Sequence, residues 1–409
     1  MAMNNYALIF ASSKNSCLSN HRQIERDRSD VDDKALTGTV CRYQIVYDHQ
    51  IFLTQEFGGV SRYFCELASR LSQNSAFDVS VIAPFHVNQH LKCARGCKAI
   101  GNYFPYRFFG ANRIRRWGSK FALQYLYWSK NKADIVHETY YSINPWGSAQ
   151  HRVLTVYDMI HELFAEEFNH DPYTTNAKRA AVSRADHVIC ISESTRQDLI
   201  RLFGVDERKT SVVHLGFTLN TDVEGRHAKL ESEKPYLLYV GSRWGYKNFI
   251  QLCRVFSSSS LNRSFDLVAF GGGAFSVSEV AELTRLGIAN RVHQVSGDDG
   301  LLASYYQGAT AFIYPSLYEG FGIPPLEAMN FGCPVLCSDT SSIPEVVGDA
   351  AVHFDPANEE SMRIAIEDLL RDDGLRAEMI RRGYARVQHF SWAKCAAETA
   401  AIYRQIYLG

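Results

Sequence analysis

Short apolar runs recur along the chain from residue 43, and amphipathic segments separate them. A polar stretch at residues 218–234 divides the runs into two series. The first series covers residues 44–47, 79–82, 134–137, 153–157, 188–191 and 211–214, and the second covers residues 236–240, 267–270, 292–295, 311–314, 335–337 and 352–354. Apolar runs that alternate with helical patterns are typical of βαβ units and parallel sheets. The pattern predicts an α/β protein with two doubly wound, Rossmann-like domains.

The same pattern predicts the domain boundaries. We expect an N-terminal domain over residues 43–217, a linker over 218–234, a C-terminal domain over 235–389 and a last helix over 390–409. Residues 1–42 are polar, densely charged and without periodicity, which predicts a poorly ordered extension. Two domains also suit the length of 409 residues, because one hydrophobic core stops growing at roughly 250 to 300.

Composition narrows the class of protein. Hydrophobic residues make up 46% and charged residues 21%, as in soluble globular proteins, and the net charge of −1 gives no global attraction to nucleic acid. The nearest cysteine pairs, Cys93/Cys97 and Cys333/Cys337, have three intervening residues instead of the two of zinc and redox motifs, so reduced thiols are expected. No apolar run approaches the roughly 20 residues of a membrane span, and residues 6–11 are too short for a signal-peptide core. The expected location is the cytoplasm.

The most informative segment covers residues 314–329, where a predicted strand leads through a glycine loop into a predicted helix. The helix is expected to open at Pro324 and Pro325, because the first N–H groups of a helix have no intrahelical partner. These free N–H groups favour an anion at the carboxyl end of a parallel strand, where ligands bind in open α/β sheets. Glu319 in the loop and Glu327, expected in the first helical turn, could hold one molecule at two points. Carboxylates accept hydrogen bonds from sugar hydroxyls well.

An ordinary place on the surface is the alternative for both glutamates, with Glu327 favoured near the helix N-terminus by the helix dipole. Gly320 and Gly322, which flank Phe321, argue against this alternative because glycine lets the backbone come close to a ligand. The segment therefore predicts a binding site.

This segment resembles the E-x7-E motif of retaining family-four glycosyltransferases of GT-B architecture, in which two doubly wound domains face a central cleft. Further matches to that family follow in the same order along nearly all of residues 43–409. They are the glycine loop at 57–63, the strand at 134–137, the I-S-x-S element at 190–194, the P-V-I-A-S-D and P-E-V-V-G elements at 334–339 and 343–348, and the start of the last helix at 390–392. In the GT-B fold that helix crosses back to the first domain.

The resemblance implies roles for individual residues. Glu327 would hold the ribose of a nucleotide diphosphate sugar, and Glu319 would contact the transferred sugar. The hydroxyls of that sugar would also meet the backbone of residues 320–322. The loop that faces the donor phosphate would contain Gly58, Gly59 and Arg62.

A basic pair after the first strand of the second domain would neutralise the leaving diphosphate without a metal. Lys247 stands at the family's lysine position. Ser242 replaces the arginine that commonly follows Gly241, and Arg243 is the candidate for its role. A solvated basic turn is the alternative for both cations. No cofactor and no metal are expected, since the Asp-x-Asp triplet at 30–32 is a pattern that a charged tail often contains by chance.

On the acceptor side, residues 155–162 align with the family's T-x-H-D segment, in which a histidine often lines the reaction centre. Tyr157 takes the place of that histidine. Asp158 and His161 are nearby candidates, and a histidine could move the acceptor proton near neutral pH. An ordinary polar contact at a strand end is the alternative for His161.

These features together predict transfer of a hexose, with mannose favoured, from a nucleotide diphosphate sugar to an acceptor hydroxyl with retention of configuration. The acceptor would belong to a surface polysaccharide or a glycolipid. The alternatives are a non-catalytic sugar-nucleotide-binding protein and a GT-B epimerase or phosphorylase.

Residues 91–132 are strongly basic and rich in aromatic residues, with no Asp or Glu. The cations are Lys92, Arg95, Lys98, Arg107, Arg113, Arg115, Arg116, Lys120, Lys130 and Lys132. Aromatic rings can lie at the headgroup level while cations face anionic lipid, so we predict a peripheral protein on the inner face of the membrane with a lipid-linked acceptor. The alternative is a solvated helical face whose aromatics fill the core. Nucleic acid is not an expected partner.

Overall fold

The computed structural model describes residues 42–93, 96–104, 118, 133–168, 170, 172–218 and 234–408, all within the unit Cys41–Gly409. The predicted extension and the predicted linker lie almost wholly outside these residues. So do eight cations of the basic segment, namely Arg95, Arg107, Arg113, Arg115, Arg116, Lys120, Lys130 and Lys132.

The first domain contains a parallel sheet whose strands follow the order β3-β2-β1-β4-β5-β6-β7. The strands are β1 (Tyr43–Tyr47), β2 (Phe77–His86), β3 (Lys98–Tyr103), β4 (Ala133–Glu138), β5 (Ala149–Val156), β6 (His187–Cys190) and β7 (Thr210–Val212). The strand order reverses direction between β1 and β4, and ligands of open α/β sheets bind beyond the carboxyl ends of strands at such a switch point.

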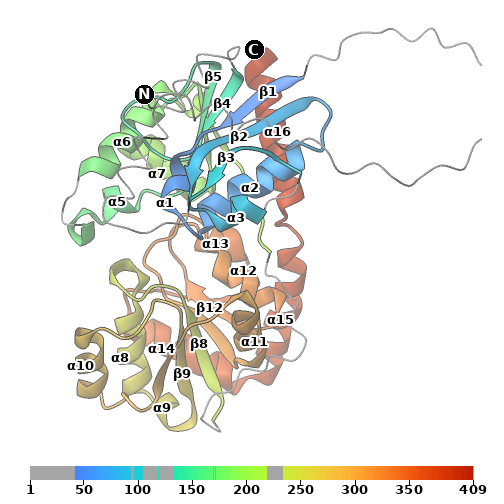
Figure 1. Ribbon diagram of the computed structural model, residues 1–409. Helices are drawn as coiled ribbons and strands as arrows, with labels where there is room; N and C mark the ends of the chain where they lie inside the picture. Colours follow the sequence, from blue (N-terminus) through green and yellow to red (C-terminus); the bar gives the residue numbers. More distant parts are fainter. Residues whose placement is uncertain are drawn as a thin grey trace, which may run out of the picture. The chain divides into compact units, whose positions relative to one another are not determined.

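In the first domain, helices lie between the strands in the order of the chain (Figure 1). They are α1 (Gln50–Thr54), α2 (Gly59–Leu71), α3 (Gln89–Cys93), α5 (Ile160–Leu163), α6 (Pro172–Arg184) and α7 (Glu193–Phe203), with short 3-10 turns η1 (Ala165–Phe168) and η2 (Glu207–Lys209). Helix α7 begins where the Ser192 hydroxyl accepts a hydrogen bond from the Thr195 N–H at 3.1 Å. It ends at Gly204, whose φ of 68° lies in the left-handed region that glycine favours.

The second domain contains a second parallel sheet with the order β10-β9-β8-β11-β12-β13. The strands are β8 (Tyr236–Val240), β9 (Asp266–Phe270), β10 (Val292–Val295), β11 (Ala311–Tyr314), β12 (Val335–Ser338) and β13 (Val352–Phe354). They agree closely with the second series of apolar runs. Strands that are covered on both faces are apolar at nearly every position, which makes them visible as continuous runs.

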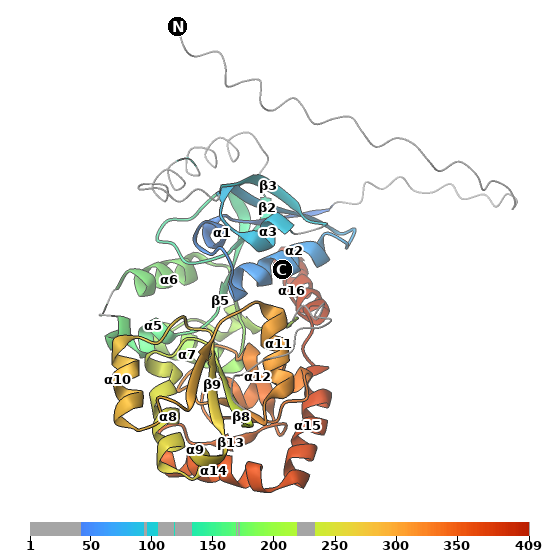
Figure 2. The same cartoon turned by 60° about the horizontal axis from the view of Figure 1, so that its bottom comes forward.

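Helices cover both faces of the second sheet, as Figure 2 shows. They are α8 (Phe249–Ser258), α9 (Leu261–Ser264), α10 (Val277–Arg285), α11 (Asp299–Gly308), α12 (Ile323–Asn330), α13 (Ile343–Val347), α14 (Glu359–Arg371) and α15 (Asp373–Val387), and the 3-10 turn η3 (Gly245–Lys247) precedes α8. Alternate strand residues serve the two faces: Leu237 packs in the cluster of α8 and α14, and Leu238 packs in the cluster of α11 and α12. The alternation follows from the two-residue period of a strand.

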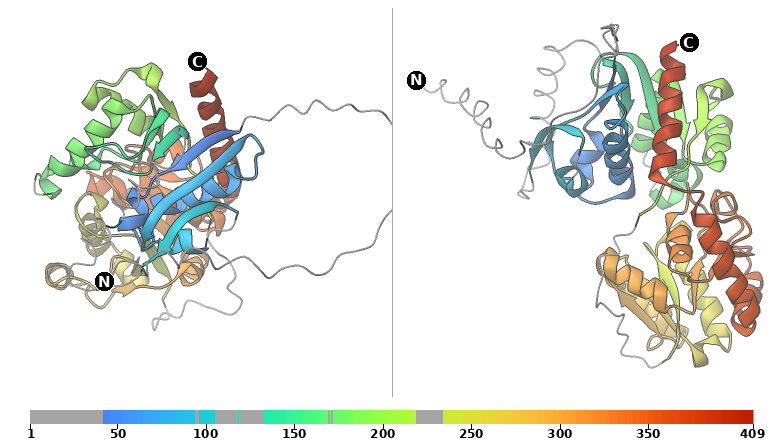
Figure 3. Two further views of the ribbon diagram at one scale, coloured as in Figure 1. Left: turned by 45° about the horizontal axis from the view of Figure 1, so that its top comes forward. Right: turned by 90° about the vertical axis from the view of Figure 1, so that its right-hand side faces the viewer.

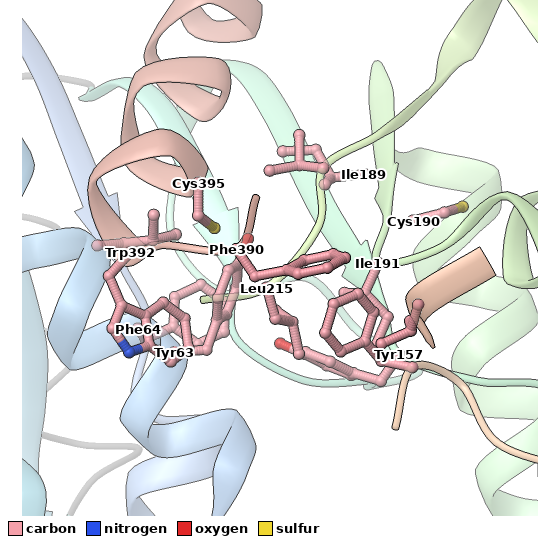
Figure 4. Close-up of a cluster of buried hydrophobic side chains, with 14 of the residues drawn as sticks. Tyr63, Phe64, Tyr157, Ile189, Cys190, Ile191, Leu215, Phe390, Trp392 and Cys395 are labelled. Atoms are coloured by element: carbon pink, nitrogen blue, oxygen red, sulfur yellow. The ribbon is translucent and has the colours of Figure 1, made fainter. Parts of the chain in front are cut away.

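The last helix, α16 (Trp392–Leu408), packs against α2 of the first domain (Figures 1 and 3). Figure 4 shows Trp392 beside Tyr63, and their ring centroids are 6.3 Å apart. Deeper in the domain, the Tyr403 hydroxyl lies 2.6 Å from His137 Nδ1. Burial lowers the pKa of His137 to about 3, so this histidine is neutral and serves the packing of α16. Among the described residues, no helix is both long enough and apolar enough to cross a membrane.

Candidate functional site

The glutamate loop, which we define as residues 315–322, joins β11 to α12 at the carboxyl end of the second sheet. Gly322 caps the helix with a φ of 105°, a conformation that favours glycine, and Ile323 is the first helical residue. Glu327 is therefore the fifth residue of α12 and lies in the second turn. The expected position in the first turn was wrong, because the glycine cap lets the helix start before the two prolines.

The structure brings Glu319 and Lys247 together. Lys247 Nζ donates hydrogen bonds to Oε1 and Oε2 of Glu319 at 2.7 and 2.9 Å, and the Glu319 side chain is only 9% exposed. The nearby Tyr314 is fully buried, and burial raises its pKa, with further contributions from the Glu319 charge and a hydrogen bond to Glu319. The tyrosine thus stays protonated and keeps a neutral donor beside the carboxylate.

Glu327 lies on α12 and accepts a hydrogen bond from the Tyr306 hydroxyl at 3.2 Å. Burial raises the pKa of Glu327 to about 7; the Tyr306 hydrogen bond and Arg62 oppose this shift, and Asp299 adds to it. Arg62 on α2 also lies 3.8 Å from Asp299, measured from Nη1 to Oδ2. The structure therefore places Arg62, from the first domain, in the electrostatic environment of Glu327.

Gly58 and Gly59 form the start of α2, a helix of 13 residues. A Cβ atom on Gly59 would meet no atom within 4 Å, whereas one on Gly58 would lie 2.2 Å from the Gln55 side chain. The open space beside Gly59 and the N–H groups of the first helical turn suit an anion. The phosphate-facing role of this loop stays a prediction.

Arg243 has a different environment from Lys247. Its Nε donates to Glu279 at 2.7 Å, and its two terminal nitrogens donate to the backbone carbonyls of Gly271, Gly273 and Ala274 at 2.8 to 3.1 Å. The side chain is 3% exposed. The guanidinium, with five N–H donors in a planar fork, suits several carbonyls at once. It braces the loop after β9, where Gly271, Gly272 and Gly273 all have positive φ. Its predicted role toward a diphosphate stays a prediction.

Asp158 and His161 lie at the start of α5, at the carboxyl end of the first sheet. Asp158 Oδ1 accepts a hydrogen bond from the Ile160 N–H at 3.1 Å, and its carbonyl accepts one from buried Lys178 at 2.9 Å. The ring of His161 stacks on Phe168 with centroids 4.2 Å apart. Tyr157 lies among the buried side chains of the core (Figure 4), and its hydroxyl donates to the Thr139 carbonyl at 3.2 Å.

The glutamate loop touches this part of the first domain. A Cβ atom on Gly320 would lie 1.8 Å from the carbonyl oxygen of Tyr157 and 3.0 Å from Cβ of Asp158. Only glycine fits against this backbone. The contact brings Asp158 next to the loop that carries Glu319.

Several polar residues at this contact were not predicted to act in the site. They are Ser192, Thr195, Ser341, Ser342 and Glu345, and all make hydrogen bonds to or across the contact. Ser192 and Glu345 lie in the elements at 190–194 and 343–348, which match the family but carried no assigned role. Thr195, Ser341 and Ser342 lie outside these elements, and no sequence signal pointed to them.

Within the described ranges, no group of three or more His, Cys, Asp and Glu residues is arranged to hold a metal ion. The Asp-x-Asp triplet at 30–32 lies outside those ranges. Independence from metals and cofactors therefore stays a prediction.

Two family models match adjacent parts of the chain. "Glycosyltransferase Family 4" matches residues 57–221, and "Glycosyl transferases group 1" matches residues 222–386. The chain is 30% identical over 247 residues to O-antigen chain mannosyltransferase B of Escherichia coli, and 30% identical over 227 residues to O-antigen chain mannosyltransferase RfbU of Salmonella typhimurium. The matches cover 57% and 54% of this chain but only 64% and 61% of those relatives' own lengths.

Solved structures resemble the whole fold. Sucrose-phosphate synthase of Thermosynechococcus elongatus superposes with a TM-score of 0.68 at 18% identity, over 90% of this chain and all of the other. WaaG, a glycosyltransferase involved in lipopolysaccharide biosynthesis, has a TM-score of 0.65 at 16% identity, over 88% of this chain and 99% of WaaG. Anabaena HepE in complex with UDP-glucose has a TM-score of 0.65 at 15% identity, over 88% and 99% of the two chains. With two adjoining family models over residues 57–386, the chain belongs to the group 1, family 4 glycosyltransferases and has the GT-B fold.

Proposed function

We propose that the protein transfers a hexose, with mannose favoured, from a nucleotide diphosphate sugar to an acceptor hydroxyl of a surface polysaccharide or glycolipid. The observation that carries the proposal is the pairing of Lys247 with both carboxylate oxygens of Glu319, eight positions before Glu327 on α12. The names of the two O-antigen relatives favour mannose and a polysaccharide acceptor. The UDP-glucose bound to HepE favours a sugar nucleotide as donor.

In the proposed mechanism, Glu327 accepts hydrogen bonds from the ribose and Lys247 faces the diphosphate. The leaving diphosphate gains negative charge while the sugar becomes cation-like, so a preorganised lysine lowers the barrier. Glu319 would then exchange part of its bond to Lys247 for hydroxyls of the sugar. Retention of configuration and independence from metals belong to this proposal.

The acceptor side is proposed to be the edge of the first domain at Asp158 and His161. The backbone of Gly320 lies against the carbonyl of Tyr157, so this edge and the glutamate loop are in contact there. Exclusion of water there would protect the donor from hydrolysis.

The test has two stages. Thermal unfolding with GDP-mannose, UDP-glucose and other sugar nucleotides should reveal the donor, because a ligand that binds only the folded state raises the melting temperature. Release of nucleoside diphosphate should then require a glycan or lipid-linked acceptor. Stabilisation without transfer to any acceptor would favour a non-catalytic binding protein. A changed free sugar nucleotide would favour an epimerase, and a sugar 1-phosphate made from a glycan would favour a phosphorylase.

We also propose that the protein works at the cytoplasmic face of a membrane, where its basic segment meets anionic lipid. Of the cations in that segment, Lys92 and Lys98 are described, and Lys92 lies 4.7 Å from the centre of the Tyr103 ring. Each cation near such a surface contributes about 1 kcal/mol. The fraction of protein that sediments with anionic liposomes should fall when salt is added. It should also fall when Arg113, Arg115 and Arg116 are replaced by Ser. Wild-type protein that stays in the supernatant at low salt would leave a soluble acceptor as the better proposal.

A further inference from the structure

The first turn of α7, in the first domain, meets the glutamate loop of the second domain. The Ser192 hydroxyl donates to the carbonyl oxygen of Gly320 at 2.7 Å, and the Thr195 hydroxyl donates to the same oxygen at 3.2 Å. Both side chains are fully buried. Two donors on one carbonyl use both of its lone pairs, so this oxygen is held in one place.

The second domain holds the same turn of α7 by a further contact. Glu345, on α13, accepts hydrogen bonds from the backbone N–H of Glu193 at 2.8 and 2.9 Å and from that of Ser194 at 3.3 Å. These first N–H groups of a helix have no partner within the helix. The carboxylate of Glu345 also pairs with His214 Nε2 at 2.6 Å. The turn is therefore tied to two separate elements of the second domain.

The held carbonyl is next to Glu319 in the chain. The Glu319 N–H donates to the Ser341 hydroxyl at 2.9 Å, and its carbonyl accepts from the Ser342 hydroxyl at 2.8 Å. Second-domain hydroxyls thus hold the Glu319 backbone, while first-domain hydroxyls hold the following carbonyl. The two sets of contacts together define the direction in which the Glu319 side chain leaves the backbone toward Lys247.

We propose that Ser192 and Thr195 are positioning residues: by holding the Gly320 carbonyl they make the placement of Glu319 depend on contact between the two domains. The proposal deepens the proposed function and rests on it. It gives a role to the I-S-x-S element at 190–194 and to the P-E-V-V-G element at 343–348, which meet at this turn. Neither residue touches the reacting atoms, so their effect reaches the site only through the loop.

The decisive variant is Thr195→Val, which removes one hydroxyl and keeps the shape of the side chain. The double variant Ser192→Ala/Thr195→Val removes both donors, and Thr195→Ser restores one. Ser194→Ala is the matched control, because it deletes a hydroxyl from the same turn. Among the described residues, the Ser194 hydroxyl makes no hydrogen bond, and its backbone N–H, which donates to Glu345, is kept. Hydrogen–deuterium exchange of residues 315–323 reports the loop, and kcat and donor KM report the reaction.

We expect Thr195→Val to speed amide exchange in residues 315–323 by about three- to tenfold and to lower kcat by a similar factor, as the loss of one buried hydrogen bond implies. The donor KM should change less than twofold because Glu327 keeps its place. The double variant should exceed the single one, Thr195→Ser should restore most of the loss, and Ser194→Ala should match the wild type.

A purely structural role would appear as faster exchange in residues 193–203 with unchanged exchange in residues 315–323, and it would overturn the proposal. So would a loss of kcat that Thr195→Ser does not restore. If the wild type binds sugar nucleotides but transfers no sugar to any acceptor, the proposed function fails, whereas unchanged loop exchange in an active enzyme refutes the positioning role alone.

Discussion

The carboxyl ends of the two sheets differ in the partners of their charged side chains. In the first domain, Asp48 follows β1 and accepts hydrogen bonds from Thr139 at 2.5 Å and from the Gln50 side chain at 2.7 Å. Glu138, the last residue of β4, pairs with Arg184 and, at 3.2 Å, with Arg152. Both carboxylates are buried, and these bonds satisfy them within the domain.

In the second domain, the charged groups keep unused capacity. Glu319 accepts hydrogen bonds from Lys247 and Tyr314, and within the described residues Glu327 accepts one hydrogen bond, from the Tyr306 hydroxyl. A carboxylate can accept about four hydrogen bonds, so both can take ligand hydroxyls. The comparison indicates that Glu319 and Glu327 on the second edge can exchange partners, as the proposed donor binding requires, whereas Asp48 and Glu138 on the first edge hold the scaffold. Five substitutions test this difference.

The largest effect is expected for Lys247→Ala, which should lower kcat by about 10²- to 10³-fold, because it removes the cation next to the leaving diphosphate. Initial rates at saturating donor measure it. Arg243→Ala is the comparison: it should cost less in kcat and more in thermal stability, since its guanidinium braces the loop at 271–274. Equal losses of kcat in the two variants would contradict the division of roles between these cations.

Glu138→Gln should act on stability and not on chemistry. It removes the charge that two arginines share, and we expect a loss of about 3 kcal/mol in the free energy of unfolding. Urea denaturation measures the loss, and the folded fraction should keep the wild-type kcat. A catalytic defect without destabilisation would show that Glu138 has a chemical role.

Glu327→Gln should weaken donor binding by about tenfold and change the pH dependence of stability. The pKa of Glu327 is raised from 4.5 to about 7, so the folded state holds this proton more tightly than the unfolded chain. The resulting stabilisation is present below pH 4.5 and is lost as pH rises through 7. At pH 8 the variant should therefore be more stable than the wild type by about 2 kcal/mol in the free energy of unfolding, and it should melt at a higher temperature. At pH 5 the difference should be smaller. If the melting temperatures of variant and wild type differ by the same amount at pH 5 and pH 8, the raised pKa of Glu327 is refuted.

The smallest effect is expected for Glu345→Gln at the contact with α7. Burial acts to raise the pKa of Glu345, but hydrogen bonds from His214 and from the N–H groups of Glu193 and Ser194 outweigh it, so the pKa lies below 4.5. The carboxylate thus contributes stability above pH 4.5 that is lost as pH falls below it. We expect the variant to lose about 1 kcal/mol at pH 7 and less as the pH falls below 4.5. A loss that does not depend on pH would mean that the charge is unimportant there.

The sequence alone determined most of the architecture. The strands of the second sheet are buried on both faces, so each appears as a continuous apolar run, and the predicted runs coincide with β8 to β13 to within about a residue. Strand β3 was missed because four of its six residues, from Lys98 to Tyr103, are exposed and the segment is not an apolar run. Glu319 and Glu327 were singled out because they lie in one short segment with glycine and proline signals, and Lys247 was singled out through the family resemblance. The structure brings Glu319 and Lys247 into contact, and the roles of all three stay predictions.

Only the tertiary structure decided which groups these side chains face. Arg243 lies two residues after a glycine at a strand end, and its sequence context fits a free cation as well as the buried brace that it forms with residues 271–279. The bonds from Ser192 and Thr195 to Gly320 join residues that are 128 and 125 positions apart. Local patterns record which residues must be buried or must turn, because those requirements act on neighbours in the chain. A partner more than a hundred residues away depends on how two domains pack, and the sequence carries no local sign of it.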